Sequence, residues 1–138
     1  MKISARNQFK GTICDIQPGA VSAIVKIDLG GQVITADITK AACEELELAV
    51  GKPAVAIIKA SNIMVAAEAM KGISARNQLA GKIVEVTEGA VNGHVKIAVG
   101  DVVVTASVTN AAIRELGLAE GACAVAIVKS TDVLVGVE

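Results

Sequence analysis

The sequence consists of an internal repeat. The hexapeptide Ile-Ser-Ala-Arg-Asn-Gln at residues 3–8 returns letter for letter at residues 73–78, and the same offset of 70 residues holds without a gap to the last residue. The two copies agree at 33 of 68 aligned positions, and only Ala69 and Met70 lie between them. A gapless match of this quality indicates two copies of one small module. We therefore expect two tandem domains, 1–68 and 71–138, and a binding site that occurs at least twice.

Each module is small and poor in aromatic side chains. A domain of this size is near the lower limit for a stable isolated core, and Phe9 is the only aromatic residue of the chain. Yet 53% of the residues are hydrophobic and the mean hydropathy is +0.60. This excess of apolar surface predicts that the copies pack on each other and on further subunits in an obligate homo-oligomer.

The composition also bears on compartment and partners. No apolar run approaches the roughly 18–20 residues of a membrane span, and the N-terminus lacks the apolar stretch of a secretory signal. The cysteines Cys14, Cys43 and Cys123 do not recur between the copies, which favours small core residues in a reducing compartment. With a net charge of −1, the chain has no basic stripe for nucleic acid. We expect a soluble cytoplasmic protein that contacts neither membrane nor nucleic acid.

The hydrophobic pattern of one module predicts five short strands and one helix. Apolar and polar residues alternate over 21–29 and 34–38, which is the period of half-buried strands. Further strands are expected over 4–16, 53–58 and 63–67, and Thr39 is placed to cap a short helix over 40–47. A helix between the third and fourth of five strands is typical of an OB-type barrel. The predicted fold is all-β: two tandem OB-like five-stranded Greek-key barrels, each with one short helix.

The residues that catalysis requires are nearly absent. His94 is the only histidine, and Ile24 takes its place in the first copy. No Cys/His pair, metal-ligand cluster or pair of facing carboxylates recurs between the copies. We expect a protein that is not an enzyme and that holds no metal cation.

Hydrogen-bond donors suited to an anion do recur. An arginine stands in each Ser-Ala-Arg-Asn segment, a lysine with nearby hydroxyls follows the most buried strand, and a threonine begins a helix whose first turn holds no acid. Each also has an ordinary interpretation as a surface arginine, a snorkelling lysine or a helix cap. The Gly-Ala-Val turns are open in the same way, since small residues can either make a plain turn or expose backbone N–H groups to an anion.

At Ser4-Ala5-Arg6-Asn7-Gln8, and again at residues 74–78, the chain strongly resembles the molbindin family of Mop-type molybdate-binding proteins, in its tandem two-domain form. The resemblance covers each copy from end to end. It implies OB-like domains that assemble into a ring, which a tandem chain completes as a trimer. It further implies that molybdate or tungstate binds as a ligand, without an organic cofactor, for intracellular molybdenum storage, buffering and homeostasis.

The resemblance implies two classes of binding site. The interfacial class lies between domains and would use Ser4, Ala5, Arg6, Asn7, Thr39, Lys59, Ala60 and Ser61, with Ser74, Ala75, Arg76, Asn77, Thr109, Lys129, Ser130 and Thr131 in the second copy. The other class lies on the symmetry axis, where the turns Gly19, Ala20, Val21 and Gly89, Ala90, Val91 are placed. His94 in place of Ile24 breaks the strict equivalence of the two halves.

Two other functions fit a tandem OB protein. It could bind single-stranded nucleic acid, although the lack of aromatic stacking residues and the net charge of −1 argue against this. It could also be an interaction module that passes a ligand signal to a protein partner, and the sequence leaves this alternative open.

Overall fold

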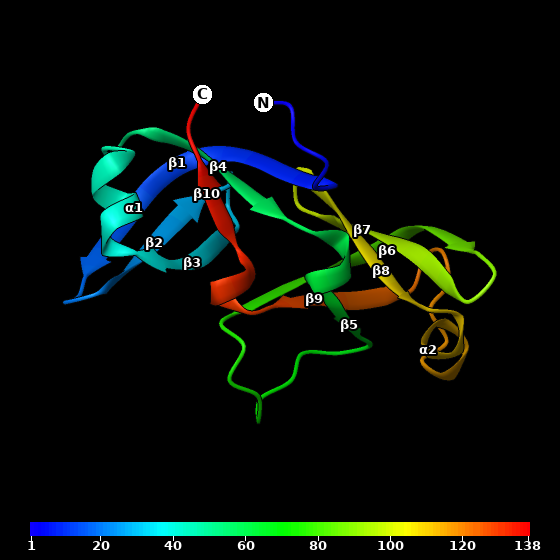
Figure 1. Cartoon of the computed structure of the whole chain (residues 1–138). Coiled ribbons are helices and arrows are strands. Elements are labelled where there is room, and N and C mark those ends of the chain that lie inside the picture. Colours follow the sequence, from blue (N-terminus) through cyan, green and yellow to red (C-terminus); the bar gives the residue numbers. More distant parts are fainter.

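A computed structural model describes residues 1–138. It contains two curled five-stranded sheets, each accompanied by one short α-helix (Figure 1), which confirms the predicted fold class. The first half contains β1 (Asn7–Pro18), β2 (Ser22–Asp28), β3 (Val33–Thr39), α1 (Lys40–Glu45), β4 (Pro53–Ile58), the 3₁₀ turn η1 (Ala60–Asn62) and β5 (Met64–Ala66). The second half contains β6 (Asn77–Glu88), β7 (Asn92–Val99), β8 (Val102–Thr109), α2 (Asn110–Glu115), β9 (Cys123–Val128), η2 (Ser130–Asp132) and β10 (Leu134–Gly136).

The long first strand of each half curls the sheet. In β1, residues 7–12 pair with β4 and residues 12–18 pair with β2, so one strand serves two neighbours. A bulge lies between Ile13 and Asp15, and bulges bend and twist a strand. At Gly11 a Cβ atom would collide with the carbonyl oxygen of Asp28, so only glycine allows β2 to approach this closely. β6 repeats this design with Gly81.

The two sheets exchange their last strands. The strand orders are β10-β4-β1-β2-β3 and β5-β9-β6-β7-β8, so each sheet takes its short edge strand from the other half. Leu134 of β10 pairs with Ile57 of β4, and Met64 of β5 pairs with Ile127 of β9. In Figure 1 the red strand β10 lies beside β4 of the first half. The sheets therefore do not follow the repeats at 1–68 and 71–138.

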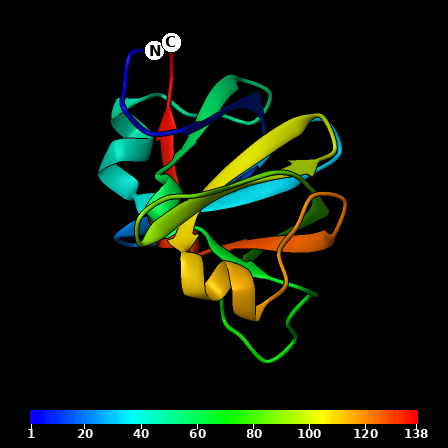
Figure 2. The ribbon, with the colours of Figure 1, turned by 90° about the vertical axis from the view of Figure 1, so that its right-hand side faces the viewer.

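The core and the chain ends join the halves further. One cluster of buried hydrophobic residues runs through both sheets, and it includes Phe9 and its counterpart Leu79. The two termini lie together (Figure 2), with the N-terminal ammonium 3.8 Å from the Glu138 carboxylate. The molecule is thus two interlocked lobes with a shared core.

The cysteines are less buried than the sequence analysis predicted. Cys14 and Cys123 are exposed and Cys43 is only partly buried, so the prediction that all three are core residues was wrong, although all three are free thiols. None of the helices has the length and hydrophobicity that a membrane crossing demands.

Candidate functional site

The start of β1 and the end of β4 bring together a pair of cations, and the second copy repeats this pair. Asn7 pairs with Ile58 in this antiparallel ladder. The preceding residue, Arg6, and the following residue, Lys59, are therefore neighbours just beyond the last rung. Both side chains are exposed. The pairing of Asn77 with Val128 makes Arg76 and Lys129 neighbours in the second half.

Arg6 and Lys59 line a cavity of about 370 Å³, here called the first pocket. It contains both segments singled out in the first copy, residues 4–6 and 59–61. Ser107 of β8 and Leu134 of β10 close it from the other half of the chain. Its full lining is Ile3, Ser4, Ala5, Arg6, Lys59, Ala60, Ser61, Ser107 and Leu134. The site is therefore composite, and neither copy forms it alone.

Asn7 holds the two halves of the first pocket in place. Its side chain is only 1% exposed. Its Oδ1 accepts from the Thr105 amide at 2.8 Å, and its Nδ2 donates to the Thr105 carbonyl at 2.9 Å and to the Ile58 carbonyl at 3.2 Å. Thr105 lies on edge strand β8, two residues before Ser107 on the same face. The amide thus clamps β8 against the start of β1, and its three hydrogen bonds all go to backbone groups rather than into the pocket.

Gln8 arranges the segment that precedes β1. Its Nε2 donates to the carbonyls of Ile3 and Ala5, both at 3.1 Å. These bonds fix the backbone around Ser4, which was predicted to belong to the first strand but lies before it. In the second half, Gln78 instead bonds to the amide and carbonyl of Met70, at 2.9 and 2.6 Å.

A second pocket of about 490 Å³ lies where Arg76 and Ser130 of the second half meet β2 and β3 of the first half. Arg76 and Ser130 reach it from the second half, and Asn77 clamps it through bonds of 2.7 and 2.8 Å to the backbone of Thr35. Its full lining is Gln17, Ile24, Lys26, Thr35, Asp37, Arg76 and Ser130. Arg76 and Ser130 are the only second-copy residues predicted to bind at the interface that line this pocket. The lining does not include Ser74, Ala75, Asn77, Thr109, Lys129 and Thr131. The second pocket extends over the β2–β3 face instead.

The cations of these pockets have no carboxylate partner. The ion pairs of the molecule join the N-terminus and Lys10 to Glu138, Lys96 to Glu85, and Arg114 to Glu88. Arg6 and Lys59 are therefore unpaired, and the first pocket contains no acidic residue. Two uncompensated cations beside serine hydroxyls form a set of donors without a competing acceptor charge. This arrangement suits a small oxyanion.

The helix starts and the Gly-Ala-Val turns form a separate region. Thr39 and Thr109 each cap a helix, accepting from the amides of Ala42 and Ala112 at 3.1 Å. The first helical amides bond at 2.8 Å to the carbonyls of Val21 and Val91 in the turns. Neither the threonines nor the turns line the two pockets. Val21 and Val91 are 79% and 71% exposed, so the turns Gly19, Ala20, Val21 and Gly89, Ala90, Val91 present small and apolar groups to the outside.

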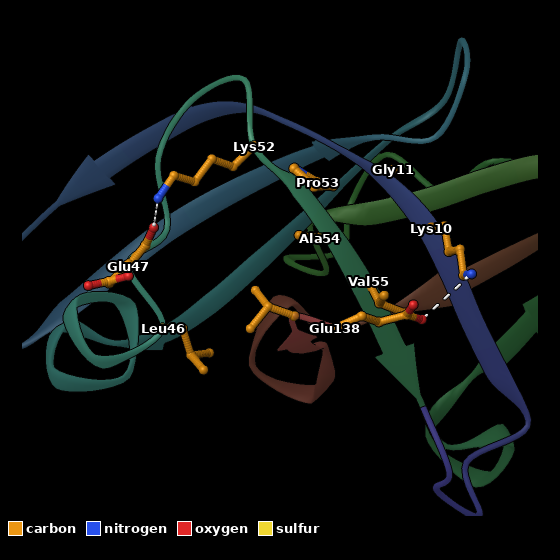
Figure 3. Close-up of a pocket in the computed structure, with 10 residues that line it drawn as sticks. Lys10, Gly11, Leu46, Glu47, Lys52, Pro53, Ala54, Val55 and Glu138 are labelled. Atoms are coloured by element: carbon orange, nitrogen blue, oxygen red, sulfur yellow. Dashed lines mark hydrogen bonds and ion pairs between the residues drawn. The ribbon is translucent and has the colours of Figure 1, made fainter.

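A third cavity, of about 360 Å³, is lined by β1, β4, the segment that follows α1 and the C-terminal residues (Figure 3). It contains Lys10 and Lys52, but both are engaged. The Lys10 ammonium is 3.6 Å from the Glu138 carboxylate, and the Lys52 ammonium donates to the Glu47 carbonyl at 3.0 Å. Both lysines are replaced by alanine in the second copy. This cavity therefore lacks the free cations and the repetition that mark the other two.

Sequence reasoning identified the charged residues of the first pocket but missed those from the opposite half. No role was predicted for Ser107 or for its counterpart Asp37. Gln8 was noticed only as part of the repeated hexapeptide. The sequence did contain a signal for Ser107 and Asp37. The alternation of apolar and polar residues places each of them on the side of its strand that faces away from the core.

Comparison with known proteins connects this geometry to a family. A TOBE domain model matches residues 3–65 and, a second time, residues 73–135. A solved structure of the cytoplasmic molybdate-binding protein ModG, with molybdate bound, superposes with a TM-score of 0.96 at 42% identity, covering 100% of both chains.

Two curated relatives match nearly the whole chain, and a third matches about half of it. The molybdenum transport protein ModE of Azotobacter vinelandii is 42% identical over 99% of this chain and 52% of its own length. The molybdenum-pterin-binding protein MopA of Rhodobacter capsulatus is 38% identical over 97% of this chain and 52% of its own. The chain thus spans about half the length of these two relatives. A probable molybdenum-pterin-binding protein of Haemophilus influenzae is 55% identical over 49% of this chain and 100% of its own length.

Proposed function

The chain belongs to the TOBE-domain family, and from this premise we propose that it binds molybdate, and tungstate in the same manner, without catalysing a reaction. The observation that carries the proposal is the meeting of unpaired Arg6 and Lys59 in a pocket free of carboxylates. We further propose that the protein acts in the cytoplasm as a store and buffer of molybdenum. The likeness to ModG, described as a cytoplasmic molybdate-binding protein, supports this role.

Each residue of the first pocket has a distinct part in binding. Arg6 offers a planar fork of N–H donors and Lys59 a compact charge, and together they offset a dianion. Ser4, Ser61 and Ser107 contribute hydroxyl donors, while Ala5 and Ala60 leave room for the anion to approach the backbone. We assign Asn7 and Asn77 a positioning role, because their amides already bond to backbone. In the second half, Arg76 and Ser130 bind, with Ser74, Ala75, Lys129 and Thr131 close by in the chain.

Selection between oxyanions would follow from size. Molybdate, tungstate and sulfate are tetrahedral dianions, so charge alone does not separate them. A pocket whose donors are spaced for the larger ions leaves sulfate with longer and weaker hydrogen bonds. Tungstate, close to molybdate in size, would bind comparably.

We also propose that the chain assembles as a homotrimer with further sites at its symmetry axis. The exposed turns at residues 19–21 and 89–91 are the candidate lining, with Thr39 and Thr109 nearby. Anion binding at interfaces between copies would stabilise the assembly, because ligand binds the assembled form more tightly. Sedimentation with and without molybdate tests this part of the proposal.

Titration calorimetry with molybdate and with sulfate tests the function itself. We expect strong heat with molybdate, a much weaker response to sulfate, and binding about 10- to 100-fold weaker in Arg6→Ala, since a charge-assisted contact contributes about 1.5–3 kcal/mol. Arg114→Ala is the matched control, because that arginine pairs with Glu88 away from the pocket. No molybdate binding by the unmodified chain, or equal loss in both variants, would refute the proposal.

A further inference from the structure

The two pockets differ in charge at one corresponding position. Ser107 lines the first pocket and Asp37 lines the second, and the two residues are related by the repeat offset of 70. Their places in the sheets also correspond, since Ser107 pairs with His94 across β7–β8 and Asp37 pairs with Ile24 across β2–β3. Both side chains are half-buried. Ser107 and Asp37 therefore occupy corresponding places in their sheets and differ only in the chemistry of their side chains.

The Asp37 charge is not neutralised by an ion pair. No lysine or arginine nitrogen lies within 4.0 Å of its carboxylate, although Lys26 and Arg76 line the same pocket. The second pocket thus holds a carboxylate beside its cations Lys26 and Arg76, whereas the first pocket holds two cations and no carboxylate.

The substitution also reverses a hydrogen-bonding role. A serine hydroxyl can donate to an oxyanion, whereas a carboxylate can only accept. A fully deprotonated tetrahedral dianion carries only acceptor oxygens, so it gains a partner at Ser107 and meets a like charge at Asp37. Like charges placed together in a half-buried site cost far more than a hydrogen bond gains.

We propose that Asp37 is a specificity-determining residue that makes the second pocket the weaker site for molybdate. This inference rests on the proposed function and deepens it. The first pocket fills at low anion concentration and the second only at higher concentration. One chain therefore buffers the anion over a wider range than two equal sites would.

Titration calorimetry with sodium molybdate at pH 7.5 separates the two sites. For the unmodified chain we expect a tight and a weak class of binding differing by tenfold or more. Asp37→Ser should tighten the weak class by about tenfold or more, and Asp37→Asn, which keeps the shape but removes the charge, should recover most of that gain. Ser107→Asp should weaken the tight class by a similar factor. The fold accepts either residue here, since each copy already carries one of them.

Controls and outcomes keep this inference apart from the proposed function. Asp101→Ser removes an exposed acid in the β7–β8 turn and should leave both classes unchanged. Tight binding with an unchanged weak class in Asp37→Ser, or two equal sites in the unmodified chain, would overturn the inference while leaving the proposed function intact. Absence of any molybdate binding by the unmodified chain would overturn both.

Discussion

Replacing Asn7 by alanine should destabilise the protein by about 3 kcal/mol. The buried amide makes three hydrogen bonds of 2.8, 2.9 and 3.2 Å, and each contributes about 1 kcal/mol net. Two of them satisfy the amide and carbonyl of Thr105 on edge strand β8. If these backbone groups found no water in place of Asn7, the penalty for unsatisfied polar groups would raise the loss to about 5 kcal/mol.

Urea denaturation followed by circular dichroism measures this change. Asn62→Ala is the control, because that asparagine side chain makes no hydrogen bond in the structure, and its effect should stay within about 0.5 kcal/mol. Asn77→Ala should cost less than Asn7→Ala, about 2 kcal/mol, since it removes two bonds rather than three. A loss below about 1 kcal/mol for Asn7→Ala would refute the idea that this amide clamps the two sheets.

Two further predictions concern the turns. Glu47 has a φ of +52° at a position where the second copy has Gly117, so Glu47→Gly should stabilise the protein by about 0.5–1 kcal/mol and Gly117→Glu should do the reverse, as measured by thermal unfolding. Backbone N–H groups of Gly31 and Gly30 donate to the Asp28 carboxylate and lower its pKa. This contribution to stability is therefore present above the ordinary carboxyl range and is lost as pH falls through the lowered pKa. The stability difference between the unmodified chain and Asp28→Ala should accordingly disappear in acid, and a difference independent of pH would contradict this.

The strands were predicted well because each one is encoded by the hydrophobic pattern of its own residues. The alternation over residues 21–29 and 34–38 and the unbroken apolar run at 53–58 correspond to β2, β3 and β4. The predicted helix extends to residue 47, but α1 ends at Glu45, since Glu47 already has left-handed backbone geometry. The resemblance predicted that Arg6 of one domain meets Lys59 or its counterpart from a neighbouring domain, whereas Arg6 and Lys59 here lie side by side within one copy.

The exchange of edge strands could not be predicted because the two partner strands are nearly interchangeable. β4 and β9 share the residues Ala-Val-Ala-Ile at 54–57 and 124–127. β5 and β10 are equally alike, each with a large apolar residue followed by Val, at Met64 and Leu134. A short edge strand can therefore pair with either sheet in the same register. Only the path of the connecting chain distinguishes the two arrangements.

The backbone partners of the repeated asparagines were not predicted, for a different reason. An amide beside an arginine has the chemistry of an anion ligand, and the sequence was interpreted in that way. The alternation of β1 contains the contrary signal, because Asn7 is in phase with buried Phe9 while Arg6 and Gln8 point outward. Its partner, the Thr105 backbone, is 98 residues away, and no local pattern indicates so distant a contact.

A crystal structure with tungstate tests the central claim most directly, because tungsten scatters anomalously and marks its own position. We predict an anomalous peak in the first pocket between Arg6 and Lys59, within hydrogen-bond distance of Ser107, and a weaker peak or none beside Asp37. A peak confined to the cavity of Lys10 and Lys52, or no peak in the first pocket at saturating tungstate, would contradict the account.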